Sequence, residues 1–252
     1  MLEALDVSFV YESTTGPLRA LSPTTLSVAR GEFVSVLGPS GCGKSTLLNL
    51  LGGLMPPTTG RVLLDGQPLE EPSDRIGFVF QEPVLLPWRT VLDNVLLPAQ
   101  MLRRPGRHDL RARELLALVG LAGFEANYPR ELSGGMRQRV ALARALSVGP
   151  EVLLMDEPFG ALDAINRERM NFELMRLWQG SGMTIVFVTH SIPEAVLLSD
   201  RVVAMTDRPG RIKEVHAVRL TRPRTSATME DDTYLGLCRS LRALLLPEAA
   251  GA

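Results

Sequence analysis

The sequence lacks the usual marks of a secreted or a membrane-spanning protein. Only two cysteines occur in 252 residues, and Cys42 lies in a glycine-rich segment where a disulfide would obstruct a bound ligand, so a reducing cytoplasm fits best. No apolar run approaches the roughly 18 residues of a membrane-spanning helix. Glu3 and Asp6 stand where a signal peptide carries positive charge. If the protein works at a membrane, we expect another chain to span it.

The sequence also has no excess of positive charge. Lysine and arginine together number 27 and aspartate and glutamate 28, which gives a net charge of -1. Nonspecific binding of DNA or RNA needs a basic surface, so nucleic acid is not an expected partner. Hydrophobic residues make up 45% of the chain, which suits a globular protein with a sizeable core.

The order of apolar segments indicates an α/β fold. Short β-rich stretches between residues 5 and 36 predict a small antiparallel sheet that leads into an apolar strand at 33–37. Further buried strands are predicted at 76–80, 152–155, 184–189 and 201–205. Strands that alternate with helices indicate a parallel sheet.

Two segments are predicted to be helical. From about residue 91 to 146, apolar residues recur at helical spacing without any strand, which predicts a mostly helical insertion. Near the C-terminus, Asp231 or Asp232 is expected to cap a helix. One face of that helix would pack against the protein through Tyr234, Cys238, Leu241 and Leu245.

The strongest local signal is a phosphate-loop pattern, GxxxxGK[ST], between a predicted strand and a predicted helix. Its residues are Gly38, Pro39, Ser40, Gly41, Cys42, Gly43, Lys44 and Ser45. Glycines let consecutive backbone N–H groups wrap a phosphate at a helix N-terminus. Lys44 would reach the β and γ phosphates and Ser45 would bind magnesium. The sequence therefore predicts nucleotide binding, with Thr46 next in the site, and leaves the reaction open.

Two acids follow the predicted strand at 152–155. Asp156 and Glu157 would lie at the end of a buried strand, although such a run alone is equally well explained as a strand that ends in a turn. Beside a phosphate loop, Asp156 is predicted to hold magnesium, and Glu157 to deprotonate the water that attacks the γ-phosphate. A kinase or a simple GTPase would need no more than this.

A second glycine-rich segment distinguishes the protein from a kinase or a simple GTPase. Residues 137–145 are strong helix formers, so the Ser-Gly-Gly before them is expected to lie at a helix N-terminus. It would then make a second anion site. The segment consists of Leu132, Ser133, Gly134, Gly135 and Met136. With it, the sequence resembles the ABC ATPase family, whose signature motif is LSGGQ, and the resemblance covers nearly the whole chain.

The resemblance implies a single ABC ATPase domain over residues 1–252 with an α/β fold of the P-loop NTPase (RecA-like) type. That fold has a parallel-sheet core, an N-terminal antiparallel β subdomain and an inserted α-helical subdomain. The implied boundaries are 1–80 and 147–220 for the core with the β subdomain, 82–146 for the helical subdomain, and 221–252 for a C-terminal helical tail.

In that family, the signature of one subunit closes over the ATP held by the phosphate loop of its partner. Ser133 and the N–H of Gly135 are then implied to donate to the γ-phosphate in trans. Met136 departs from the family's glutamine, which removes a polar side chain at the rim but no backbone donor.

The remaining family positions are filled in order. Gln81 resembles the Q-loop glutamine that senses magnesium and the γ-phosphate, Asp163 the D-loop aspartate, and His190 the H-loop histidine that bonds the γ-phosphate. Tyr11 resembles the aromatic residue that stacks on adenine, with Phe9 as the competing choice.

Three segments narrow the branch: residues 81–90, 159–163 and 207–212 resemble importer ATPases for nitrate, sulfonates and taurine. That branch implies ATP and Mg²⁺ as ligands and a location on the cytoplasmic face of the inner membrane. The implied partners are a second ATPase subunit, a transmembrane permease and, indirectly, an extracytoplasmic solute-binding protein. An apolar cluster is predicted to receive a coupling helix of the permease or to pack the insertion against the core: Val84, Leu85, Leu86 and Trp88.

Alternatives from other classes are an exporter motor, a soluble ABC ATPase of translation or DNA repair, and a P-loop kinase. The last two fit less well, because such ABC proteins usually carry two ATPase units and a kinase needs an acceptor lid in place of residues 132–136. The sequence leaves open the cargo, the resting oligomeric state, and the choice between a homodimer and a heterodimer.

Overall fold

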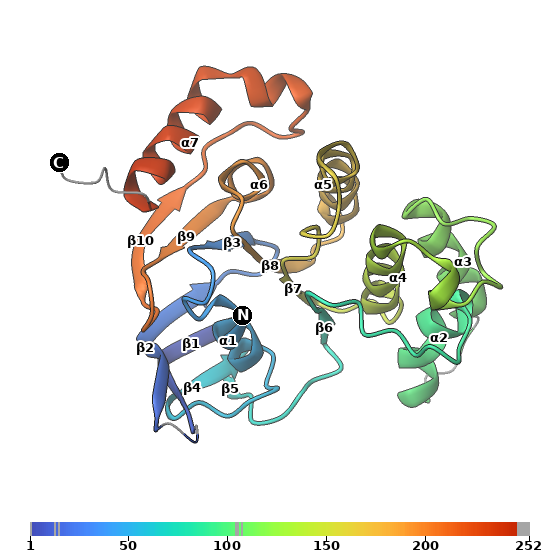
Figure 1. The fold of residues 1–252 in the computed structure, drawn as a ribbon, viewed down its shortest axis with the longest axis horizontal. Helices are drawn as coiled ribbons and strands as arrows, with labels where there is room; N and C mark the ends of the chain where they lie inside the picture. Colours follow the sequence, from blue (N-terminus) through green and yellow to red (C-terminus); the bar gives the residue numbers. More distant parts are fainter. Residues whose placement is uncertain (1, 13, 15, 104–105, 107, 246–252) are drawn as a thin grey trace. The chain divides into compact units, whose positions relative to one another are not determined.

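The computed structural model of the protein describes residues 2–12, 14, 16–103, 106 and 108–245. The chain forms two compact units (Figure 1). The first unit comprises Met1–Ser73 and Thr184–Ala252, and the second unit comprises Asp74–Met183. The subdivision that the family resemblance implies stays a prediction.

The first unit contains the predicted antiparallel sheet. Its strands are β1 (Leu2–Tyr11), β2 (Leu18–Val28), β4 (Thr59–Leu64) and β5 (Gln67–Pro68), in the order β2-β1-β4-β5. Strands β1 and β2 confirm the prediction for the N-terminal segment. Strands β4 and β5 were not predicted; β4 pairs with the other edge of β1 from beyond the phosphate loop, and β5 pairs with β4.

A second set of strands in this unit carries the phosphate loop. Strand β3 (Phe33–Leu37) lies between β8 (Thr184–Thr189) and β9 (Arg201–Met205), parallel to both. Strand β10 (Ile212–Ala217) then pairs antiparallel with β9. All three predicted strands are confirmed. Every residue of β3 and β8 is buried, as expected for parallel strands covered on both faces.

Helices pack directly on these strands. Helix α1 (Lys44–Leu51) contacts β1 and β8, and α6 (Ile192–Leu198) contacts β3 and β8. A 3-10 turn, η2 (Ser226–Glu230), leads into α7 (Asp232–Leu245), which packs on α6.

The predicted C-terminal helix is confirmed, with Asp231 as its cap. The Asp231 Oδ1 accepts a 2.7 Å hydrogen bond from the Thr233 N–H. On the packing face Tyr234 and Leu241 are buried, whereas Cys238 and Leu245 are half-buried. The Tyr234 hydroxyl donates to the Pro193 carbonyl at 3.2 Å, which ties α7 to the start of α6.

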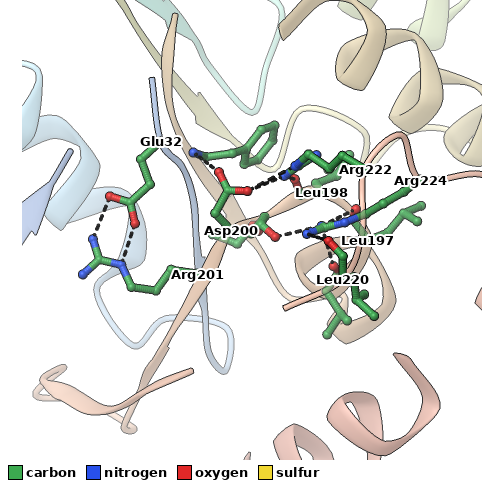
Figure 2. Close-up of polar contacts among 12 residues, drawn as sticks. Glu32, Leu197, Leu198, Asp200, Arg201, Leu220, Arg222 and Arg224 are labelled. Atoms are coloured by element: carbon green, nitrogen blue, oxygen red, sulfur yellow. Dashed lines mark hydrogen bonds and ion pairs between the residues drawn. The ribbon is translucent and has the colours of Figure 1, made fainter. Parts of the chain in front are cut away.

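A buried arginine closes the other end of α6 (Figure 2). Arg224 Nη1 donates to the carbonyls of Val196, Leu197 and Ser199 at 3.1, 2.8 and 2.8 Å. Carbonyls in the last turn of a helix have no partner inside the helix, so this guanidinium replaces a cap. Burial, and to a smaller extent the nearby Arg222, lower the pKa of Arg224 to about 10.

Asp200 joins the same segment to β3. Arg222 Nη2 donates to Asp200 Oδ1 at 2.8 Å, and Asp200 Oδ2 accepts from the Phe33 N–H at 3.0 Å. A neighbouring pair, Glu32 and Arg201, approaches to 2.9 Å (Figure 2). These contacts fasten residues 218–224 to the start of the central strand.

Replacing Arg224 with methionine is expected to lower the free energy of unfolding by about 2 kcal/mol, because buried carbonyls lose their donor. The matched control is Arg219→Met, whose side chain is exposed, with an expected change within about 0.5 kcal/mol. Urea denaturation of both variants checks this, and equal midpoints would contradict the capping role.

The second unit is mostly helical. It contains the parallel strands β6 (Ile76–Val79) and β7 (Val152–Asp156). Its helices are α2 (Val91–Met101), α3 (His108–Leu118), α4 (Gly134–Leu146) and α5 (Ala164–Trp178), with a 3-10 turn, η1 (Pro129–Glu131). The predicted insertion is thus confirmed as helical in its described residues, and the two strands differ from prediction by one residue each.

Helices α2, α3 and α4 pack on one another through small and branched apolar side chains. The buried members include Val91, Val95, Ala99, Ala112, Leu115, Leu116, Val140 and Ala143. Across the described residues of both units, no helix is both long and apolar enough to cross a bilayer.

Candidate nucleotide site

The phosphate loop leaves β3 at Gly38 and enters α1 at Lys44. Gly41 and Gly43 have φ angles of 73° and 106°, in the left-handed region that favours glycine. A Cβ on Gly43 would lie 2.7 Å from the Ala20 carbonyl oxygen. The loop therefore takes this shape only with glycine at position 43.

Lys44 is bent back over its own loop. The side chain is buried, and its Nζ donates to the carbonyls of Gly38 and Pro39, each at 2.9 Å. A helix N-terminus, glycine backbone and an ammonium group together make a site suited to a phosphate. These features fit a nucleotide, as the sequence predicts.

The turn between β9 and β10 supports the loop from outside. The Gly210 N–H donates to the Ala20 carbonyl and its own carbonyl accepts from Ser22, both at 2.9 Å. A Cβ on Gly210 would lie 2.0 Å from the Cys42 carbonyl oxygen. Residues 207–212, which the sequence marks as typical of one branch, thus buttress the phosphate loop, a role that the motif did not reveal.

Cys42 is buried inside this arrangement. Burial raises the pKa of its thiol, and the nearby Lys44 only partly opposes that effect. The thiol is therefore neutral near pH 7 and is a packing group, not a nucleophile.

Replacing Gly210 with alanine is expected to weaken ATP binding about tenfold or more, because the new Cβ would displace the Cys42 carbonyl and with it the loop. The matched control is Gly236→Ala in α7, where a Cβ meets nothing within 4 Å. Titration with a fluorescent ATP analogue measures both, and equal affinities would refute the buttress.

Tyr11 ends β1 and lies beside α1. Its hydroxyl is 3.1 Å from Thr46 Oγ1, and its ring meets Phe9 edge-on, with centroids 4.7 Å apart. Tyr11 is exposed, whereas Phe9 is half-buried. The exposure favours Tyr11 over Phe9 as the ring available to adenine.

His190 follows β8 and is exposed. Its neighbours brace the turn: Thr189 Oγ1 donates to Glu194 at 2.6 Å and accepts from the Ser191 N–H at 3.0 Å. The backbone on both sides of His190 is therefore fixed.

In the second unit, Asp156 is the buried last residue of β7. Glu157 follows with a φ of 42°, and its carbonyl accepts from the Gly160 N–H at 3.1 Å. A left-handed conformation costs a glutamate about 1 kcal/mol or more, and such strain gathers at functional sites.

The signature segment caps α4. Ser133 Oγ accepts from the Met136 N–H at 3.2 Å and keeps its own proton to donate. A Cβ on Gly135 would lie 2.3 Å from Leu162 Cδ2, so the signature packs on the D-loop. Leu132 is buried at the start of this turn.

Asp163 caps α5 in the same way. Its Oδ1 accepts from the Asn166 N–H at 3.0 Å, and hydrogen bonds from Asn166 lower the pKa of the carboxyl group.

The predicted magnesium ligands are single groups on different elements. Ser45 lies in the first unit, and Gln81 and Asp156 in the second. Among the described residues no group of three or more histidine, cysteine or acidic side chains gathers. Each of these residues carries an oxygen of the kind that Mg²⁺ takes together with nucleotide phosphates, and their role as magnesium ligands stays a prediction.

Comparison with known proteins identifies the family. Residues 21–160 match the family described as ABC transporter. The chain belongs to that family. It is 51% identical over 221 residues to the taurine import ATP-binding protein of Burkholderia pseudomallei, covering 87% of this chain and 85% of that protein. It is 47% identical over 237 residues to the nitrate import ATP-binding protein of Synechococcus elongatus, covering 92% and 86%.

A solved structure gives the same fold. It is a dimeric ATP-binding cassette in a post-hydrolysis state, bound to ADP and Pi. The TM-score is 0.80 at 36% sequence identity, over 88% of this chain and 100% of that one. The predicted α/β fold of P-loop NTPase type is thus confirmed, and the ABC protein described here is an ATPase.

Proposed function

We propose that this ABC protein is the ATP-hydrolysing motor subunit of an importer for nitrate, a sulfonate, taurine or a similar small solute. The observation that carries the proposal is the pair of glycine-rich helix N-termini, one at the phosphate loop and one at Ser133, each of which is suited to an anion. One chain with one phosphate loop has no use for the second, unless another chain supplies the phosphate. The names of the taurine and nitrate relatives support import.

In this mechanism, Lys44 and the backbone of the phosphate loop hold the β and γ phosphates of ATP. Ser45, Gln81 and Asp156 would hold Mg²⁺, which neutralises charge on the phosphate oxygens. Glu157 accepts a proton from the attacking water as the bond from the γ-phosphorus to the bridging oxygen breaks. His190 donates to the γ-phosphate, and ADP and phosphate leave.

The second chain completes the site. In a head-to-tail dimer, Ser133 and the Gly135 N–H of one copy donate to the γ-phosphate held by the other. Leu162 lies against the signature of its own chain, and Asp163 follows Leu162. Both are positioned to respond when that signature moves. The dimeric state of the related cassette supports this assembly, and we propose two identical copies.

The motor acts on a separate permease at the cytoplasmic face of the inner membrane, with an extracytoplasmic solute-binding protein as an indirect partner. Residues 80–90, here called the docking loop, are proposed to receive the permease. In this loop Val84 is 60% and Trp88 71% exposed, whereas Leu85 and Leu86 are half-buried. An exposed aromatic residue beside apolar neighbours is typical of an interaction anchor.

Glu157→Gln is expected to lower phosphate release at least about 100-fold, since it removes the general base. ATP binding is retained, so the variant should shift from monomer to dimer in size-exclusion chromatography when ATP and Mg²⁺ are added. The control is Lys44→Ala, which should show neither turnover nor the shift. Normal turnover by Glu157→Gln would remove the base assignment, and phosphate transfer to a small acceptor would indicate a kinase.

Trp88→Ala is expected to leave the ATPase rate of the isolated protein unchanged and to abolish its association with the permease. The control is Met101→Ala, which alters another exposed apolar residue, 73% exposed, outside the docking loop. Co-purification of each variant with the co-expressed permease subunits measures this. Equal association of the two variants would place the docking surface elsewhere.

A further inference from the structure

The docking loop is bound to the helix that begins with the signature. Gln138 Nε2 of α4 donates to the Phe80 carbonyl at 3.0 Å. Arg144, farther along α4, donates from Nη2 to the Pro83 carbonyl at 3.0 Å and from Nη1 to the Val84 carbonyl at 2.8 Å. Six residues of α-helix span about 9 Å, so the two side chains fix both the position and the direction of the loop.

These contacts are partly sheltered from water: the hydrogen bonds to the Phe80 and Pro83 carbonyls are part-buried, whereas the one to the Val84 carbonyl is exposed. Gln138 is 3% exposed, and burial lowers the pKa of Arg144. Taking a guanidinium out of water is costly unless its donors are used, and here two of its N–H groups reach loop carbonyls. An arginine held in this way orients the backbone that it binds.

The backbone bound by Arg144 is strained. Val84 has a φ of 42°, which is an outlier for a β-branched residue and a strained backbone conformation. Val84 is also one of the two exposed large apolar side chains in the docking loop. The strain therefore lies at the point where Arg144 and the proposed permease surface meet.

The far side of the docking loop is fixed to α2. Asn94 is fully buried, and its Nδ2 donates to the carbonyls of Leu86, Arg89 and Thr90 at 3.1, 3.1 and 2.9 Å. Its Oδ1 accepts from the Leu86 N–H at 2.8 Å. The loop thus has two attachments, and the one at Val84 leads along a single rigid helix to Ser133.

We propose that Arg144 is a positioning residue that couples the docking loop to the signature. Gln138 provides the second contact between α4 and the loop. Arg144 holds Val84 in its strained conformation only while α4 keeps its place beside the loop. Movement of the signature onto a partner's ATP carries α4 with it and alters the loop at Val84. This inference rests on the proposed function, because it requires the signature to engage ATP.

Trp88 provides a direct readout of the loop. The chain has two tryptophans, so Trp178→Phe leaves Trp88 as the single emitter. In a Trp178→Phe, Glu157→Gln chain, ATP and Mg²⁺ are expected to change both the elution volume and the emission of Trp88. Adding Arg144→Met should abolish the emission change while the ATP-dependent dimer is retained. Arg144→Lys, which has one ammonium group in place of the guanidinium and its two donors, should restore the emission change in part.

The matched control is Arg139→Met. Arg139 is also on α4, burial also lowers its pKa, and it also donates to a carbonyl, but to Val119 at 3.1 Å. Arg139→Met should keep the emission change.

Equal emission changes in the two methionine variants, or a parent chain that dimerises without any change at Trp88, would overturn the coupling role. A parent chain that does not dimerise with ATP would instead overturn the proposed function. If Arg144→Met does not fold, the comparison of Arg144→Lys with Arg139→Lys decides.

Discussion

The carbonyl of Cys42 lies where a side chain at Gly210 would have to be, and the phosphate loop depends on that space. A Cβ at position 210 would approach the Cys42 oxygen to 2.0 Å, and one at Gly43 would approach the Ala20 oxygen to 2.7 Å. Two backbone segments thus press on the loop and leave it one shape. That shape sets the direction of Lys44 and of the start of α1. Phosphate binding therefore depends on glycine at positions 43 and 210, where a side chain would displace the loop.

Residue pattern alone predicted the parallel strands and placed Lys44 and Ser133 at helix starts, whereas the roles assigned to the site residues stay predictions. Phe33–Leu37, Thr184–Thr189 and Arg201–Met205 are continuous apolar runs because both their faces are covered, and such runs can be recognised without a structure. Capping residues such as Ser133 and Asp231 could also be predicted, since a side-chain oxygen at a helix start accepts a hydrogen bond from a backbone N–H of the first turn. Boundaries shifted by one residue where the chain turns out of β6 and β7.

What the sequence did not predict depends on contacts between distant segments. Strand β4 pairs with β1 across about fifty to sixty residues of chain, and the two-residue β5 pairs with β4, so no local pattern marks them. The left-handed backbone of Glu157 and Val84 is imposed by surrounding structure, not by residue type. The hydrogen bonds of Arg144 to the docking loop likewise join residues about sixty positions apart. An arginine in a helix pattern is usually read as a solvated side chain.

The central claim is that one ATP is shared between the phosphate loop of one copy and the signature of the other. It is tested by mixing two differently tagged chains, Lys44→Ala and Ser133→Arg, in a Glu157→Gln background, and measuring mass by native mass spectrometry with ATP and Mg²⁺. Each variant alone lacks a complete site and should stay monomeric, whereas the mixture contains one complete site and should form the mixed dimer. A dimer of either variant alone, or a mixture that stays monomeric while the parent chain dimerises, would contradict the account.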